Sequence, residues 1–152
     1  MTARTRWSAG LIAAVSLVAL TGCQQPTPLV SLVSGGRTVH SEASVYCFAG
    51  QSAEKQNCRT PQTRPTVLRV KTNAPVNIDV SKPLAQAGWV VILPGEDADP
   101  KNDRTSGKLT SHYFSLGSPQ LSGPLRVEVR MLNHGRTDVA TVGNWEFVLV
   151  PA

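Results

Sequence analysis

Charged side chains are scarce in this sequence of 152 residues, at 16% of the total, and aromatic side chains make up 5%. Average soluble domains carry about 25% charged residues. The length suits one domain, because domains typically have about 100–150 residues. These figures exclude a multi-domain enzyme, a polytopic membrane protein and a highly charged disordered chain.

The sequence also lacks the motifs of several enzyme classes. It has no Gly-x-Ser-x-Gly nucleophile elbow, no glycine-rich phosphate loop, no paired glycosidase carboxylates and no haem attachment motif. Its histidines, His40, His112 and His134, have no His-x-x-x-His spacing. We therefore expect no catalytic residues, no cofactor and no enzymatic activity. A hydrolase or a metalloprotein is the alternative with the least support.

The N-terminus has the pattern of a secretory signal peptide. Arg4 and Arg6 give it a positive start without an acid, and the apolar run AGLIAAVSLVAL follows at residues 9–20. A run of this length is typical of a signal-peptide core, whereas a membrane span needs about 20 apolar residues. We expect residues 1–22 to form a signal peptide that is removed. A short uncleaved anchor is the alternative.

The signal peptide ends in Leu20-Thr21-Gly22-Cys23, which looks like the lipobox of bacterial lipoproteins. That motif combines a branched apolar residue, two small residues and the cysteine that receives the lipid. We expect acylation of Cys23, with residues 23–28 as the lipidated cysteine and a short tether. Several acyl chains, at about 0.8 kcal/mol per buried methylene, hold a protein stably on a bilayer. A secretory signal with a chance cysteine is the alternative.

The expected address is the outer face of the cell membrane, with the lipid bilayer as the first partner. Removal of residues 1–22 lowers the net charge from +5 to +3, because they carry two arginines and no acid. A charge of this size gives no support for binding nucleic acid.

The cysteine count is odd, and acylation of Cys23 leaves Cys47 and Cys58 as one pair. In an exported domain one remaining pair predicts a structural disulfide. A metal site needs more ligands than two thiols, and redox-active pairs usually have Cys-x-x-Cys spacing.

Strand patterns dominate the rest of the chain. We expect strands at residues 29–33, 37–45, 66–72, 76–80, 89–93, 112–116, 125–131 and 145–149. Residues 81–87 are the exception, with one or two helical turns. Seven or eight strands with one apolar face each are buried most simply by two packed sheets. We predict an all-β, immunoglobulin-like β-sandwich over residues 29–152, with a small β-barrel as the alternative.

Trp89 and Trp145 each lie at the start of an apolar strand. This position is typical of core aromatics. The alternative is an exposed pair that stacks on a sugar, which predicts ligand contacts at both residues.

Two further groups of residues offer weaker hypotheses. The acidic residues Glu96, Asp97, Asp99 and Asp103 lie in one loop and are oxygen ligands that calcium prefers, but Lys101 interrupts them. We interpret this loop as a solvated turn and predict no metal.

A copper site would use histidine with Met131 and His134, but no free cysteine completes it. Met131 instead continues the apolar face of its strand. The basic residues Arg59, Arg64 and Arg69, with Lys71, form a loose group that suits anionic lipid head groups. A solvated strand face is the simpler interpretation.

Several short motifs give the chain a family resemblance. They are the lipobox, Pro26-Thr-Pro-Leu-Val30, Val39-His-Ser-Glu-Ala43, Tyr46-Cys47, Cys58, Val76-Asn-Ile-Asp-Val80, Ala85-Gln-Ala-Gly-Trp-Val90 and Trp145-Glu-Phe. With these motifs the chain resembles a family of small actinobacterial lipoproteins of unknown function. The resemblance implies an envelope lipoprotein with a paired-cysteine β domain and supplies no catalytic residues.

Together these patterns predict a non-catalytic lipoprotein that binds an envelope protein or glycan. The main alternative is a glycan-binding or small-ligand-binding module that uses exposed tryptophan.

Overall fold

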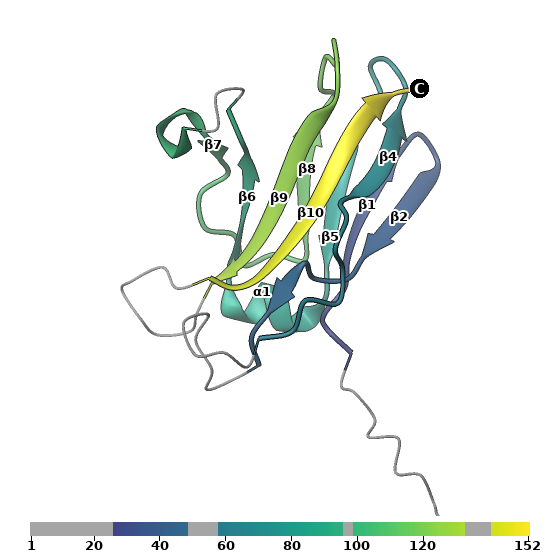
Figure 1. The fold of residues 1–152 in the computed structure, drawn as a ribbon. Coiled ribbons are helices and arrows are strands. Elements are labelled where there is room, and N and C mark those ends of the chain that lie inside the picture. The colour runs from purple at the N-terminus through teal and green to yellow at the C-terminus, as the bar shows by residue number, and fades with distance from the viewer. Residues whose placement is uncertain (1–25, 49–57, 96–98, 133–140) are drawn as a thin grey trace, which may run out of the picture.

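The computed structural model describes residues 26–48, 58–95, 99–132 and 141–152. These residues form ten strands, one α-helix and one 3₁₀ turn (Figure 1). In chain order the elements are β1 (Val30–Ser34), β2 (Arg37–Ser41), β3 (Val45–Tyr46), β4 (Thr66–Val70), β5 (Val76–Val80), α1 (Lys82–Ala87), β6 (Trp89–Leu93), η1 (Pro100–Asn102), β7 (Arg104–Thr105), β8 (Tyr113–Gly117), β9 (Leu125–Leu132) and β10 (Thr141–Pro151).

The strands form two separate sheets that pack face to face (Figure 1). One sheet has the order β2-β1-β5-β8, and the other has the order β3-β10-β9-β6-β7 with β4 beside β10. The predicted all-β sandwich is therefore confirmed, and the barrel alternative is wrong. Strands β5 and β8 lie in one sheet and β6, β9 and β10 in the other, which is how immunoglobulin-like sandwiches divide strands B and E from C, F and G.

The core follows the alternation seen in the sequence. In β9 the buried side chains are Val127, Val129 and Met131, and in β10 they are Trp145, Phe147 and Leu149. Successive side chains of a strand lie on opposite faces, so each of these strands has one apolar face toward the other sheet. Met131 is part of this core, as its place in the strand predicts.

Strand β10 is longer than the expected strand at residues 145–149, because its two ends find different partners. It runs beside β9 along most of its length. Its beginning pairs with β3, where Gly143 lies opposite Tyr46. Its end pairs in parallel with β4, from Phe147 to Pro151.

The strand expected at residues 37–45 is two strands, β2 and β3, in different sheets. The chain leaves the first sheet after Ser41 and joins the second at Val45. Ala43 lies between them and is fully buried, so this crossing is part of the core. This split adds one strand to the eight expected, and the two-residue strand β7 adds the other.

The short helix α1 connects β5 in one sheet with β6 in the other and confirms the helical turns expected at residues 81–87. Leu84, Ala85 and Ala87 are its buried side chains. Gly88 ends the helix with φ of 86°, a conformation that glycine adopts without steric cost. Figure 1 shows α1 at the lower end of the sandwich, the end at which the described chain begins.

Candidate functional site

The chain joins the sandwich at its lower end through Thr27 and Pro28. Thr27 is 6% exposed, and its hydroxyl accepts a hydrogen bond from the amide of Ala43 at 3.4 Å. The indole N–H of Trp145 donates to the carbonyl oxygen of Pro28 at 2.9 Å. Among the described residues, the packed domain therefore begins at Thr27, two residues before the expected boundary at 29.

Several predicted site residues lie outside the described residues. These are Leu20, Thr21, Gly22, Cys23, Glu96, Asp97 and His134. In the part of the chain that the structure describes, no helix is long and apolar enough to cross a membrane.

The predicted disulfide is confirmed and lies at the same end of the sandwich. Cys47 and Cys58 are bonded, with their Cα atoms 4.2 Å apart, and Cys47 is fully buried. Beside it, Tyr46 and Arg59 exchange two backbone hydrogen bonds of 2.8 Å. The disulfide therefore holds the segment after residue 57 against the end of the second sheet.

An aromatic cluster accompanies the disulfide. The ring of Tyr46 packs edge-on against Phe48, with centroids 5.0 Å apart, and against Trp145, at 6.1 Å. The guanidinium of Arg59 lies 5.3 Å from the centre of the Phe48 ring, a cation–π contact. Burial raises the pKa of the Tyr46 hydroxyl above its ordinary value of 10.0.

Two clefts flank the point where the chain enters, and Pro26 and Thr27 line both. The first has a volume of about 510 Å³ and is also lined by Glu42 and Arg59. The second has a volume of about 620 Å³ and is lined by aromatic and proline side chains, Phe48 among them. The lining combines apolar surface with one acid and one base, which suits contact with a partner surface.

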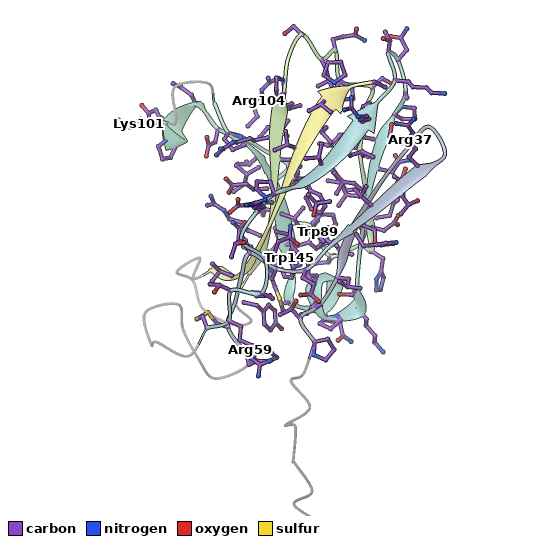
Figure 2. The ribbon with its side chains drawn as sticks, turned by 45° about the vertical axis from the view of Figure 1, so that its right-hand side comes forward. Arg37, Arg59, Trp89, Lys101, Arg104 and Trp145 are labelled. Atoms are coloured by element: carbon purple, nitrogen blue, oxygen red, sulfur yellow. A yellow bond between two sulfur atoms is a disulfide. The ribbon has the colours of Figure 1, made fainter. Side chains whose placement is uncertain are left out.

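Neither tryptophan is exposed, so the hypothesis of a tryptophan platform for sugar is wrong. Trp89 and Trp145 are both 0% exposed. The indole N–H of Trp89 donates to the carbonyl oxygen of Ser111 at 2.8 Å, as that of Trp145 does to Pro28. With its only polar group bonded to the backbone, each ring is buried without an unpaired donor. Figure 2 shows both residues between the sheets.

The two described histidines, His40 and His112, do not lie close together. His40 lies on β2 with its Nδ1 2.8 Å from the hydroxyl of Ser31, and the Nδ1 of His112 is 3.1 Å from the carbonyl oxygen of Val80. Strands β1 and β5 separate the two histidines in the sheet. Among the described residues no three histidine, cysteine or acidic side chains come close enough to hold a metal ion.

The two described acids of the acidic loop, Asp99 and Asp103, accept hydrogen bonds from backbone amides. The carboxylate of Asp99 accepts a hydrogen bond from the amide of Lys101 at 3.0 Å and caps η1. The carboxylate of Asp103 accepts from the amide of Gly95 at 3.1 Å. Both contacts organise turns, as the interpretation of a solvated turn predicts.

The loose basic group does not gather on one surface. Arg59 lies at the lower end of the sandwich (Figure 2). Arg69 belongs to β4 and Lys71 follows it, beside Gly35 in the turn between β1 and β2. Because that turn is at the opposite end, these cations are spread along the whole domain.

A third hollow, which sequence reasoning missed, lies along one open side of the sandwich. It is a cavity of about 130 Å³ between β6, β7 and β8, lined by Val91, Leu93, Arg104, Thr105, Ser106, Phe114 and Leu116. A neighbouring depression of about 530 Å³ shares Leu93, Arg104 and Leu116 with this cavity and extends over residues 119–125. The lining comes from four separate parts of the chain, none of which has a recognisable motif.

Comparison with known proteins gives a family and no activity. No curated protein and no solved structure matches the chain. One family model, described as "Protein of unknown function (DUF2771)", matches residues 23–136, which include both bonded cysteines and every strand up to β9. The chain therefore belongs to the DUF2771 family.

Proposed function

We propose that this chain is a lipoprotein of the cell envelope, anchored through acylated Cys23, whose sandwich domain binds another envelope component and catalyses no reaction. The signal-peptide pattern and the lipobox support the anchor. The disulfide between Cys47 and Cys58 supports export, because such bonds persist in oxidising compartments. The excess of arginine over lysine, ten to five, supports an actinobacterial origin.

The observation that carries this proposal is how early the chain is fixed to the domain. Thr27 is already buried and bonded to Ala43, only four residues after Cys23. Four extended residues span at most about 14 Å. A lipid on Cys23 would therefore keep the lower end of the sandwich close to the bilayer surface. The sides and the upper end would face the envelope and remain open to a partner.

The role of binding, rather than catalysis, rests on the character of the described hollows. The clefts at Pro26 and the cavity beside β8 are lined by prolines, apolar side chains and hydroxyl groups, with Glu42 and Arg59 in the first cleft and Arg104 at the cavity. Such surfaces recognise a partner through shape and apolar contact. The glycan alternative depended on exposed tryptophan, and Trp89 and Trp145 are both buried.

Acylation is tested by comparing the full chain with the Cys23→Ala variant in cells supplied with an alkyne fatty acid. We expect the full chain to carry the label and to sediment with membranes. The Cys23→Ala chain should lose the label and leave the lipid-bearing membrane fraction. The double variant Cys47→Ala/Cys58→Ala is the matched control and should keep the label. A labelled or equally membrane-bound Cys23→Ala chain would refute the anchor.

The binding role is tested by cross-linking in intact cells, followed by purification of the acylated chain. We expect one envelope protein to cross-link reproducibly to the full chain and not to an unrelated lipoprotein with the same anchor. Cross-links to that control lipoprotein at the same level, or none with any envelope component, would contradict the proposal.

A further inference from the structure

We propose that the edge strand β8 binds an extended segment of a partner protein by strand addition, and that one large apolar side chain of this segment fills the cavity beside β8. This inference rests on the proposed binding function and names its partner class. Strand addition joins a peptide to an exposed sheet edge through main-chain hydrogen bonds, with pockets for alternate side chains.

Strand β8 is an edge strand whose pairing with β5 is regular from Tyr113 to Ser115 and shifts in register only beyond it, before Gly117. It ends the sheet with order β2-β1-β5-β8, and none of its five residues is buried. Its sequence, YFSLG, has no charge and no proline, and Tyr113 is 51% exposed. Natural edge strands are usually blocked by charged residues or proline. The opposite edge of the same sheet, β2, carries Arg37, and the edge strand β4 carries Arg69.

The hydrogen-bond pattern directs backbone groups of β8 outward. The amide of Val80 donates to the carbonyl of His112 at 2.9 Å, so these residues form a bonded pair with β5. Bonded and non-bonded pairs alternate in an antiparallel ladder, and Tyr113 and Ser115 occupy the non-bonded positions. The carbonyl of Tyr113 accepts from the hydroxyl of Ser111 at 2.7 Å. The N–H groups of Tyr113 and Ser115 and the carbonyl of Ser115 therefore remain available to pair with an added strand.

The cavity lies where the inward side chains of an added strand would point. Phe114 and Leu116 of β8 form one wall, and Val91 and Leu93 of β6 form the other. Its volume is about 130 Å³. An apolar cavity of about 150 Å³ holds a benzene molecule, so this one accepts a single leucine-sized or phenylalanine-sized group.

Arg104 gives the cavity a positive mouth. Its guanidinium has no hydrogen bond or ion pair with any other described residue, and the side chain lines both the cavity and the neighbouring depression. Figure 2 shows Arg104 on the side of the domain away from Arg59 and the chain entry. A cation beside an apolar cavity complements an acidic residue of the partner. Side chains two positions apart share one face of a strand, so that acid would lie two residues from the apolar one.

These observations favour a protein segment over a lipid. A lipid tail would not use the N–H groups of Tyr113 and Ser115, and the cavity has room for one side chain rather than a long acyl chain. A partner strand uses the backbone groups, the cavity and Arg104 together.

The probe is a displayed library of random 12-residue peptides, selected on the full acylated chain in lipid nanodiscs. We expect enriched peptides that share a large apolar residue two positions from an acid. Binding should weaken about tenfold in Ser115→Pro, because proline removes one outward N–H from the edge. Ser115→Ala keeps that N–H and is the matched control, with binding within about twofold of the original chain. Arg104→Gln should weaken binding about fivefold.

A second measurement keeps the test valid if Ser115→Pro does not fold. The selected peptide is made with backbone N-methyl groups at successive positions and bound to the unchanged chain. Strand addition predicts that every second N-methyl group abolishes binding, since only alternate amides face β8. Uniform sensitivity, or none, would overturn the proposal.

The other outcomes also decide the matter. Strand addition would be overturned if no peptide is enriched, or if the peptide binds Ser115→Pro and Ser115→Ala equally. It would also be overturned if the chain self-associates through β8, or if lipid vesicles that contain palmitate displace the peptide. An envelope protein that cross-links elsewhere on the domain would leave the proposed function intact while the inference about β8 falls.

Discussion

The indole N–H of Trp145 donates to the carbonyl oxygen of Pro28 at 2.9 Å, across a separation of 117 positions. The strand that contains Trp145 lies inside the second sheet, between β9 and its partners β3 and β4. The first residues of the domain are therefore held by its last strand. A pull on the N-terminal tether would be resisted by the core rather than by a loop.

Replacement of Trp145 by phenylalanine should loosen this attachment. The variant loses the hydrogen bond to Pro28 and leaves a space in a fully buried site. We expect the free energy of unfolding to fall by about 2–3 kcal/mol. We also expect faster hydrogen exchange at the Ala43 amide, whose acceptor is the hydroxyl of Thr27. Chemical denaturation and amide exchange measure the two effects.

Trp89→Phe is the matched control. Trp89 is equally buried, and its indole N–H donates to Ser111 rather than to the entry segment. A similar loss of stability is expected, without faster exchange at the Ala43 amide beyond that global loss. Equal exchange at Ala43 in the two variants, after correction for stability, would contradict a specific role for the bond to Pro28.

Gly143 allows two aromatic rings to approach the backbone of β10. A Cβ atom at this position would lie 2.7 Å from Cη2 of Trp145 and 2.9 Å from Cδ2 of Tyr46. Both rings are buried and have little freedom to move. Gly143→Ala is therefore expected to lower the free energy of unfolding by about 1–3 kcal/mol through overpacking.

Gly123 provides the comparison, because a Cβ there would meet no atom within 4 Å. Gly123→Ala should leave stability unchanged or raise it by up to about 1 kcal/mol, since alanine restricts the unfolded chain. Thermal unfolding of both variants measures the difference. A Gly143→Ala protein as stable as Gly123→Ala would show that the aromatic cluster can rearrange.

Loss of the disulfide should destabilise the domain. Cys47 and Cys58 are 11 positions apart, and the chain-entropy model gives a closed loop of this size about 3 kcal/mol. We expect Cys47→Ala/Cys58→Ala to lower the free energy of unfolding by that amount and to be insensitive to reductant. The unaltered protein should lose a similar amount on reduction. A protein whose unfolding does not change with reductant would contradict a stabilising role.

Much of the fold can be predicted from the sequence, because the strands are marked by apolar runs and by the alternation of apolar and polar side chains. The apolar run Trp89–Leu93 and the alternating segment Val76–Val80 coincide with β6 and β5 at both ends. The beginning of β10 was missed, since residues such as Gly143 have low strand propensity and are held there by pairing with β3. A strand at residues 37–45 looked continuous because no local signal marks the change from one sheet to the other.

The candidate sites were harder to predict, because they depend on contacts between distant residues. The disulfide followed from counting cysteines. The burial of Trp89 depends on the carbonyl of Ser111, 22 positions away, and no local pattern reports that contact. The cavity beside β8 is lined by ordinary residues such as Leu93 and Leu116, which become a site only when two sheet edges face each other. The exposed edge itself had a signal in the sequence, the uncharged run YFSLG.

The partial burial of Tyr46 should make the domain sensitive to alkali. Burial raises its pKa in the folded state above the ordinary value of 10.0 that applies when the chain is unfolded. Above that pH the unfolded state releases this proton before the folded state does, so the free energy of unfolding falls as pH rises through the folded pKa. Below pH 10 the contribution is fully present. One group changes stability by at most about 1.4 kcal/mol per pH unit.

Tyr46→Phe isolates this effect, because phenylalanine keeps the ring that packs on Phe48 and Trp145 and has no proton to lose. We expect the two proteins to have similar stability near about pH 8 and the variant to be the more stable near about pH 11. Urea denaturation across this range gives the difference, and tyrosinate absorbance reports the ionisation directly. Parallel pH profiles for the two proteins would mean that Tyr46 ionises in the folded state as easily as in the unfolded chain.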